Sequence, residues 1–342
     1  MKIYRGLIVV FICTVLFNMG VVSCLKQAEK DGYYPCKPIA EGVRVGEVAY
    51  KTDYSQQSFY SLKDNKIVST NSFADWDLAF DSSDKGMNIY LNSAKFMHAA
   101  NTQKTKLDEV CSPKGWKFAF DASSGNLDSL AMAKWGVNNN GTYVSKKEVY
   151  VLDLGADASG KALGYKKLIV EDLQNGAFHL RYADMDGSNE TSFRVQKQDN
   201  KRRVYFSFDE GGKQVDVEPD KNQWDLLFTQ YTTYLYDGKQ YIEYLVRGVL
   251  SNKGVEVGRI STIPFANLCS KDISGVEFSK NADGIGHTWK KFDMTSFTYV
   301  VLDKRIYIVR TNDQQQYKLH FTSYFNDQGQ KGYPEFAYEV LY

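Results

Sequence analysis

The pentapeptide Trp76-Asp77-Leu78-Ala79-Phe80 returns later in the chain as Trp224-Asp225-Leu226-Leu227-Phe228. Four further elements recur around the two copies in the same order, with residues 59–62, 109–112, 147–152 and 165–168 matching residues 205–208, 267–270, 304–309 and 317–319. Matched elements in one order indicate an internal duplication. The sequence therefore predicts two related domains, at residues 37–186 and 187–342.

The repeated elements have the patterns of β-strands. Large apolar residues alternate with smaller or polar ones in residues 76–80, so one face of that strand is expected to be buried and the other solvated. Residues 149–152 and 306–309 are continuous apolar runs, as in strands that are covered on both faces. Asp237-Gly238 between two strand-like runs predicts a hairpin with a primed turn.

Helical signals are few, and only residues 127–134 have the pattern of a short helix. The composition, with 24 Tyr and 6 Pro in 342 residues, also favours strands. We therefore predict an all-β chain of two tandem antiparallel β-sandwich-like domains.

The N-terminus has the features of a bacterial lipoprotein signal. Lys2 and Arg5 precede an apolar run at residues 6–22, which ends in Val21-Val22-Ser23-Cys24. A membrane-spanning anchor is the alternative, but that run is short beside the roughly 20 residues that a span needs. We predict a signal peptide at residues 1–23, lipidation of Cys24, and a lipidated tether at 24–36. Leu25, in place of an aspartate, favours the outer membrane.

The charge balance and the motifs exclude several functions. With 42 basic and 41 acidic residues, the chain has no strong field of one sign, which argues against a nucleic-acid partner. Four histidines and the absence of nucleophile-elbow, zinc-protease, C-x-x-C and phosphate-loop motifs argue against an enzyme.

Three cysteines remain once the signal peptide and Cys24 are set aside. Cys111 and Cys269 occupy matched places in the repeat, so both are expected to pack as small buried side chains. Cys36 with Cys111 is the favoured pair if a disulfide forms, and one thiol is then left over.

The arrangement resembles the HmuY family of haem-binding lipoproteins of Bacteroidota. Five segments carry the resemblance, all in the second half: Tyr205-Phe206-Ser207-Phe208, Trp224-Asp225-Leu226, Trp289, residues 306–310, and residues 317–324 followed by Gly332-Tyr333-Pro334-Glu335-Phe336. Residues 37–186 resemble a more diverged second copy. The resemblance implies an all-β fold that holds haem in a surface groove.

The resemblance also implies axial ligands for the haem iron. One family ligand follows a tryptophan, and Met294 lies at that position, five residues after Trp289. A thioether ligand is chemically sound and favours reduced iron. The other ligand lies earlier in the family, yet no His or Met occurs between Trp224 and Gly286, and His287 is the nearest candidate. The first copy has Asn140 at the position of Met294.

The remaining candidate residues have simpler interpretations. Met97 and His98 are adjacent, so on a strand they would point to opposite faces and would not share one metal. Asp77 and Asp225 are expected to bond nearby backbone rather than act as acids. Trp76 is expected to be a core anchor, like its repeat Trp224.

We therefore predict an outer-membrane lipoprotein that binds haem or a related tetrapyrrole and passes it to an outer-membrane transporter. Met294 would coordinate the iron, with His287 as a second haem contact. The alternative is a surface lipoprotein without haem that serves as an interaction or carbohydrate-binding module on the same fold.

Overall fold

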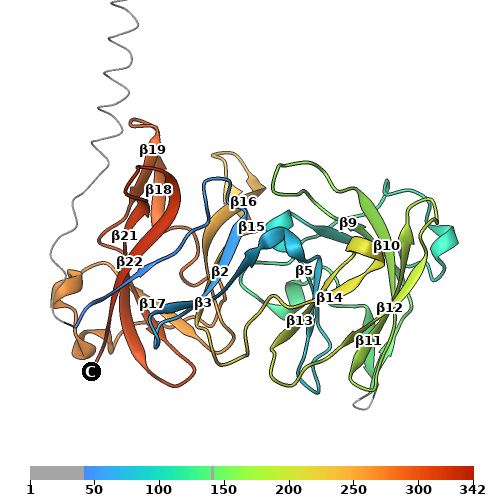
Figure 1. Cartoon of the computed structure of the whole chain (residues 1–342), viewed down its shortest axis with the longest axis horizontal. Coiled ribbons are helices and arrows are strands. Elements are labelled where there is room, and N and C mark those ends of the chain that lie inside the picture. The colour runs from blue at the N-terminus through green and yellow to red at the C-terminus, as the bar shows by residue number, and fades with distance from the viewer. Residues whose placement is uncertain (1–41, 140–141) are drawn as a thin grey trace, which may run out of the picture.

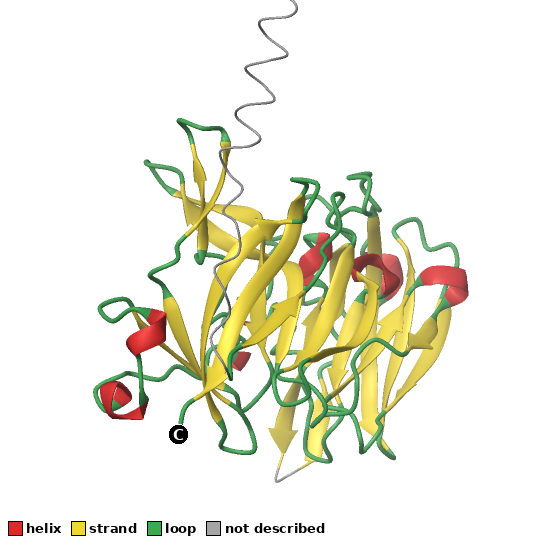
Figure 2. Cartoon of the chain, turned by 60° about the vertical axis from the view of Figure 1, so that its left-hand side comes forward, coloured by secondary structure: helices red, strands yellow, loops and turns green. Residues whose placement is uncertain are grey.

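The computed structural model describes residues 42–139 and 142–342, so the predicted signal peptide, Cys24, Cys36 and Asn140 lie outside the described residues. Strands dominate what is described, and the helices there are short 3-10 turns (Figure 2). These turns are η1 (Phe73–Asp75), η2 (Ser93–Lys95), η3 (Leu107–Glu109), η4 (Leu127–Ser129), η5 (Asp209–Gly211), η6 (Phe265–Asn267) and η7 (Ser270–Ile273). The all-β prediction is confirmed.

Two bodies of antiparallel sheet lie side by side (Figure 1). The first body holds a five-stranded sheet in the order β12-β11-β10-β9-β6, a four-stranded sheet in the order β14-β13-β4-β5, and the hairpin β7–β8. The strands are β4 (Leu78–Asp81), β5 (Ile89–Leu91), β6 (His98–Asn101), β7 (Gly136–Asn139), β8 (Thr142–Ser145), β9 (Val149–Asp153), β10 (Tyr165–Gln174), β11 (Ala177–Asp184), β12 (Thr191–Gln196), β13 (Arg203–Ser207) and β14 (Lys213–Val215).

The second body repeats this plan with a five-stranded sheet, β1-β22-β21-β20-β17, a four-stranded sheet, β16-β15-β2-β3, and the hairpin β18–β19. The strands are β1 (Arg44–Glu47), β2 (Gln56–Ser61), β3 (Lys66–Ser72), β15 (Leu226–Tyr236), β16 (Tyr241–Ser251), β17 (Glu256–Ile260), β18 (Lys290–Asp293), β19 (Thr298–Val301), β20 (Ile306–Arg310), β21 (Gln316–Phe325) and β22 (Lys331–Val340). The hairpin predicted around Asp237-Gly238 is present as β15–β16, although its loop is longer than the expected two residues, since Tyr236 pairs with Tyr241.

The two halves of the sequence exchange strands. β2, from the first half, pairs with β15 and places Phe59 opposite Leu227. β13, from the second half, pairs with β4 and places Tyr205 opposite Ala79. Strand pairing therefore runs across the predicted boundary at residues 186 and 187. In Figure 1 the blue strands β2 and β3 lie in the red and orange body, and β13 and β14 lie in the green one.

Each body has its own apolar core, and both cores contain exchanged residues. The core of the first body includes Val204 and Phe206 from β13. The core of the second includes Tyr60 from β2. A third cluster joins the bodies, where Trp224 packs edge-on against Phe59 and Trp76 packs edge-on against Tyr205. The repeated tryptophans thus anchor the junction rather than the centre of either core.

Two local predictions were wrong. Leu78, Ala79 and Phe80 are all buried, because the face that was expected to be solvated lies against the cluster that joins the bodies. The helix predicted at residues 127–134 is only η4. The amide of Ala131 donates to the Asp121 carboxylate at 2.8 Å, although a continuing α-helix would bond that amide to Leu127.

The burial predicted for the two matched cysteines was also wrong. Cys111 is exposed and Cys269 is half-buried. The residue before each cysteine, Val110 or Leu268, fills the apolar space instead. The continuous apolar runs were predicted correctly, since residues 149–152 and 306–309 are fully buried.

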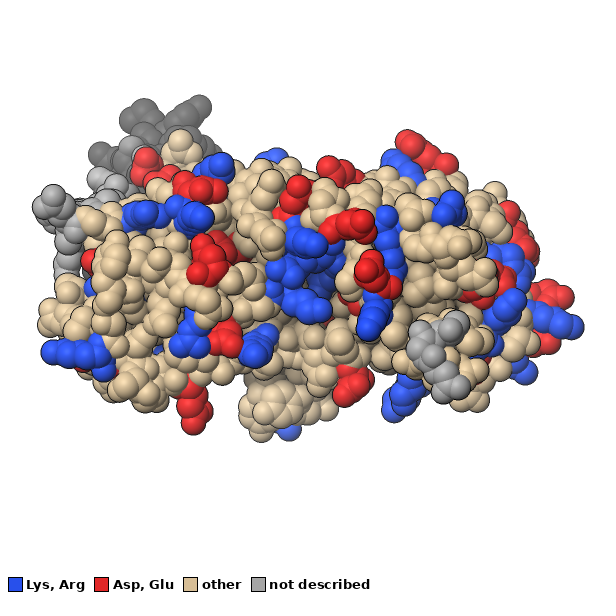
Figure 3. Space-filling model, turned by 90° about the horizontal axis from the view of Figure 1, so that it is seen from below, with Lys and Arg blue, Asp and Glu red and all other residues tan. Residues whose placement is uncertain are grey.

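The surface carries a mixture of charges, in keeping with the formal net charge of +1. On the face in Figure 3, basic side chains gather near the middle, with acidic side chains close beside them. No helix within residues 42–139 and 142–342 has the length and hydropathy needed to cross a membrane.

Candidate functional site

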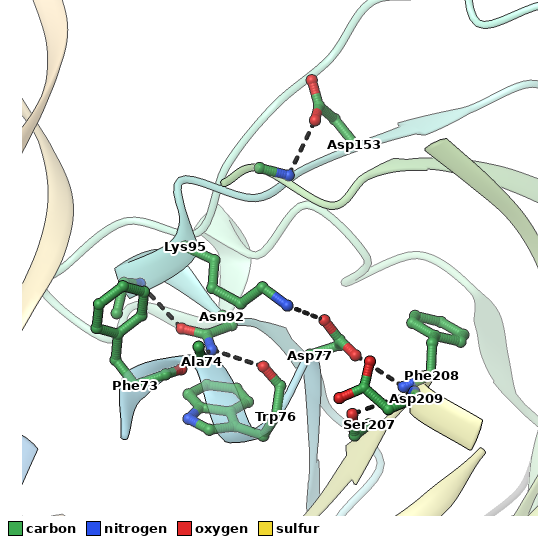
Figure 4. A network of polar contacts seen from close by, with 12 residues as sticks. Phe73, Ala74, Trp76, Asp77, Asn92, Lys95, Asp153, Ser207, Phe208 and Asp209 are labelled. Atoms are coloured by element: carbon green, nitrogen blue, oxygen red, sulfur yellow. Dashed lines mark hydrogen bonds and ion pairs between the residues drawn. The ribbon is translucent and has the colours of Figure 1, made fainter. Parts of the chain in front are cut away.

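Asp77 and Asp225 have the same structural role in the two copies. Asp77 accepts a hydrogen bond from the Phe208 amide at 2.7 Å, and Asp225 accepts one from the Leu62 amide at 2.9 Å. Each aspartate thus holds the end of an exchanged strand. Figure 4 shows this network in the first copy, where Lys95 also pairs with Asp77. The prediction that both aspartates bond backbone is confirmed, but the amides belong to the exchanged strands and not to nearby sequence.

Met97 and His98 are held apart, as the strand pattern predicts. Met97 is fully buried in the core of the first body. The His98 ring bonds the Phe96 carbonyl oxygen at 3.0 Å through Nδ1 and the Glu243 carboxylate at 2.9 Å through Nε2. Both nitrogens are therefore used, and Nε2 makes a contact between the two bodies through Glu243.

Met294 lies at the turn of the β18–β19 hairpin, directly after Asp293 ends β18. Its side chain is 70% exposed, and Phe297 in the same turn is 74% exposed. The turn is ordered by the Asp293 carboxylate, which accepts hydrogen bonds from the Thr295 and Ser296 amides. The hairpin therefore presents a thioether and an aromatic ring to solvent at its tip.

One face of this hairpin is lined by apolar and aromatic groups. The register pairs Lys290 with Val301 and Phe292 with Tyr299, which places these four side chains on the same face. Phe292 and Tyr299 contact each other at a centroid distance of 5.4 Å, and Tyr299 contacts Tyr324 of β21 at 5.1 Å. This inner face connects the exposed tip to the core of the second body.

Lys290 lies at the root of the hairpin, and its ammonium is surrounded by rings. It lies 4.2 Å from the Trp289 ring and 4.7 Å from the Tyr324 ring, and it donates to the Arg247 carbonyl oxygen at 2.7 Å. Burial, together with the positive charge of Arg247, lowers the pKa of Lys290 to about 7. Arg247 stacks over Tyr54 at 4.3 Å.

His287 is half-buried before the root of the hairpin. Its Nδ1 lies 3.4 Å from the Tyr231 hydroxyl, and burial lowers its pKa. His287 precedes the start of β18, and Met294 follows its end. The four residues of β18 between them span about 13 Å. The structure does not bring Met294 and His287 together at one iron.

The β15–β16 hairpin adds further exposed aromatic residues. Tyr234, Tyr236, Tyr241 and Tyr244 are each at least half exposed. Burial is the largest cause that raises the pKa of Tyr299, followed by the neighbouring Tyr54, and Tyr244 of this hairpin raises it further. Tyr244 therefore lies near the inner face of β18–β19.

The sequence did not reveal Arg247, Lys290 or Tyr54 as site residues. Lys290 is next to Trp289, but a lysine between a tryptophan and a second lysine is typical of a solvated strand position. Arg247 and Tyr54 are separated from it by 43 and more residues, so only the folded chain brings them together. The one signal in the sequence was Arg247, a basic residue inside a Tyr-rich strand.

Comparisons with known proteins agree with the duplication. The model of the family described as HmuY protein matches residues 53–196 and again residues 199–338. No curated protein matches the sequence.

Solved structures with a related description are distant. The HmuY analog of Tannerella forsythia in its apo form is 11% identical, with a TM-score of 0.25, 88% of this chain and 96% of that chain covered. Apo PinO, given as from Porphyromonas gingivitis, is 8% identical, with a TM-score of 0.26 and coverage of 88% and 97%. A chain described as an HmuY-like heme binding protein of Bacteroides vulgatus is 15% identical, with a TM-score of 0.21 and coverage of 51% and 91%. These scores are too low to support an argument, so the assignment rests on the family model. By that double match, the chain belongs to the HmuY family.

Proposed function

We propose that this protein binds haem or a related tetrapyrrole beside the β18–β19 hairpin of the second body. The observation that carries the proposal is the tip of that hairpin, where Met294 and Phe297 are mostly exposed. Large apolar side chains that cluster in water on a folded body are typical of binding surfaces. Membership of the HmuY family supports the same ligand.

The residues around the hairpin suit the chemistry of such a ligand. Met294 would supply a thioether to the iron, a ligand that favours the reduced metal. Phe292 and Tyr299 offer apolar and aromatic surface to the flat macrocycle. A single soft ligand on an exposed turn fits a carrier that must release its cargo. We place His287 outside the iron's coordination sphere, because it lies at the opposite end of the hairpin.

We further propose that lipidated Cys24 anchors the protein to the outer membrane and that it passes its cargo to an outer-membrane uptake system. One lipid chain alone gives only weak membrane binding, so the anchoring depends on the additional acyl chains of a bacterial lipoprotein. We propose no catalytic step.

The exposed tyrosines favour a second candidate, a carbohydrate-binding or interaction module. Tyr236 and Tyr241 contact each other at 5.4 Å near the turn of β15–β16, and both are more than half exposed. Aromatic rings of this kind can stack on sugars. In this alternative the four exposed tyrosines of the β15–β16 hairpin, rather than Met294, would form the site.

Titration of the soluble protein from Gln27 onward with haem, followed by absorbance, separates the two candidates. Met294→Ala tests the site, and Met185→Ala, at a half-buried position in the first body, is the control for loss of a methionine elsewhere. We expect saturable one-to-one binding that Met294→Ala weakens and Met185→Ala does not. A free-haem spectrum for all three proteins, together with binding to a polysaccharide that Tyr241→Ala abolishes, would replace the tetrapyrrole proposal with the second candidate.

A further inference from the structure

Arg247 and Lys290 form a pair of neighbouring cations without an anion. Among the described residues, neither side chain has a carboxylate partner: the Arg247 guanidinium donates to the Leu245 carbonyl, and the Lys290 ammonium donates to the Arg247 carbonyl. Lys290 is only 8% exposed. The Nε of Arg247 is buried and without a hydrogen-bond partner in the described chain. Buried charges are normally paired, so this arrangement is incomplete.

The first body has uncharged residues at the positions that match Arg247 and Lys290. Trp135 is the repeat of Trp289, and its indole N–H donates to the Met87 carbonyl at 2.8 Å. At the matched place in the second body, Lys290 donates to the Arg247 carbonyl instead, and the buried indole nitrogen of Trp289 has no partner in the described chain. Met87 therefore corresponds to Arg247.

The residue of the first body that matches Lys290 is also uncharged. Gly136 follows Trp135 as Lys290 follows Trp289, and a Cβ on Gly136 would lie 2.5 Å from the Tyr143 ring. Tyr143 packs on Trp135 at 4.7 Å, whereas the Lys290 ammonium lies on the Trp289 ring in the second body. The fold thus needs neither cation at these two positions.

The surroundings limit what kind of anion fits. Tyr54 lies under the guanidinium of Arg247, while Tyr299 and Tyr324 line the side of Lys290. A guanidinium donates two parallel hydrogen bonds to a carboxylate, and the rings favour an anion attached to a flat conjugated body. Met294 lies at the other end of the same hairpin, about 13 Å along β18. A tetrapyrrole with carboxylate side chains extends over such a distance.

We infer that Arg247 and Lys290 form the anion site of the second body and bind a carboxylate side chain of the tetrapyrrole. This inference rests on the proposed function. It adds a ligand contact that is independent of the iron, and it predicts that the metal-free macrocycle also binds. It also assigns the site to the second body alone, because the first has Met87 and Gly136 at the two positions.

The anion site predicts a dependence of binding on pH. The groups that face Lys290 are Arg247, His287, Tyr299 and Tyr324, and none of them supplies a negative charge near neutral pH. A bound carboxylate favours the protonated amine, so binding near pH 7 takes up a proton. Affinity for the carboxylate ligand is therefore expected to fall as the pH rises from 7 to 9.

The test compares metal-free protoporphyrin IX, which has free carboxylates, with its dimethyl ester, in the soluble protein from Gln27 onward. We expect the diacid to bind at least tenfold more tightly than the diester. Arg247→Met copies the first body and should remove most of this preference, as should Lys290→Met. Lys291→Met, on the opposite face of the same strand, should leave it intact. Melting temperatures report whether each variant is folded.

The outcomes separate the two proposals. Equal affinities for the diacid and the diester, or a preference that persists in both folded variants, would overturn the anion site and leave tetrapyrrole binding in place. If diacid, diester and haem all fail to bind, the proposed function is wrong and the anion site is wrong with it.

Discussion

Lys95 forms an ion pair with Asp77 in the interior of the first body, and the second body has no base at the matched position. The side chains of Lys95 and Asp77 are 6% and 4% exposed. Lys95 comes three residues after Asn92, and Val255 comes three residues after the matching Asn252, where it is fully buried. Asp225 therefore binds the Leu62 amide without a lysine at the position that Lys95 occupies beside Asp77.

Replacement of Lys95 by methionine should destabilise the protein strongly. The variant leaves the Asp77 carboxylate buried without its cation, and loss of one partner of a buried pair typically lowers the free energy of unfolding by about 3–5 kcal/mol. Urea unfolding of Lys95→Met against the wild type measures the effect. A loss below about 1 kcal/mol would show that water or another base replaces the lysine.

Asp225→Asn should have the opposite effect at neutral pH. Burial raises the pKa of Asp225 to about 6, so the folded protein binds this proton more tightly than the unfolded chain. The free energy of unfolding therefore falls as the pH rises from about 4 to 6, and the loss is complete above 6. Asparagine keeps an acceptor for the Leu62 amide and has no charge. We expect Asp225→Asn to be at least as stable as the wild type at pH 7 and to lose that advantage at pH 4.

Two buried lysines, Lys167 on β10 and Lys318 on β21, should be essential for holding the η3 and η6 turns on the five-stranded sheets. Lys167 donates to the carbonyls of Leu107 and Val110 around η3, and Lys318 donates to those of Phe265 and Leu268 around η6. Each variant to methionine leaves buried carbonyls without donors, at a cost of about 1–3 kcal/mol. Lys166→Met, on the more exposed neighbour of Lys167, serves as the control. Similar unfolding midpoints for Lys167→Met and Lys166→Met would contradict this role.

The exchange of strands predicts which fragments fold. Residues 72–221 contain all strands of the first body, whereas residues 42–186 lack β12 to β14 and carry β1 without β22 and the β2–β3 pair without β15. We expect the first fragment to give a cooperative thermal transition and the second to be degraded rapidly by protease. Comparable folding of both fragments would show that each half is an independent domain.

The sequence predicted the duplication and the strand class because matched strands have matched patterns of apolar residues. It could not predict the exchange. Residues 59–62 and 205–208 resemble each other, so either could pair with either copy of the repeated pentapeptide. The structure pairs residues 58–60 with β15 and residues 203–206 with β4. Tyr317, Leu319 and Phe321 alternate with Lys318 and His320, a pattern typical of a strand with one solvated face. Lys318 is nevertheless buried, because a lysine that caps a distant turn has the same local pattern as an exposed one.

The site could be predicted only in part for a similar reason. Met294 was found from its spacing to Trp289, and the structure places it on an exposed turn. Arg247 and Tyr54 come from distant strands and loops, so their contact depends on the tertiary fold. No local pattern distinguishes Lys290 from Lys291.

Lys290 should make stability depend on pH in the alkaline range. Burial lowers its pKa to about 7, so above that pH the folded protein binds fewer protons than the unfolded chain. The free energy of unfolding should rise between pH 7 and about 9.5, by at most about 1.4 kcal/mol per pH unit. Lys290→Met should lack this slope. Parallel pH profiles for the two proteins would mean that the amine is solvated in the folded state.

The most direct test of the account is the absorbance spectrum of the haem complex in its oxidised and reduced forms, for the wild type and Met294→Ala. Because a thioether favours reduced iron, we predict that reduction gives the wild type a spectrum distinct from that of free haem and that Met294→Ala loses this difference. A broad free-haem spectrum that is the same in both proteins, before and after reduction, would contradict the proposal that this protein carries haem through Met294.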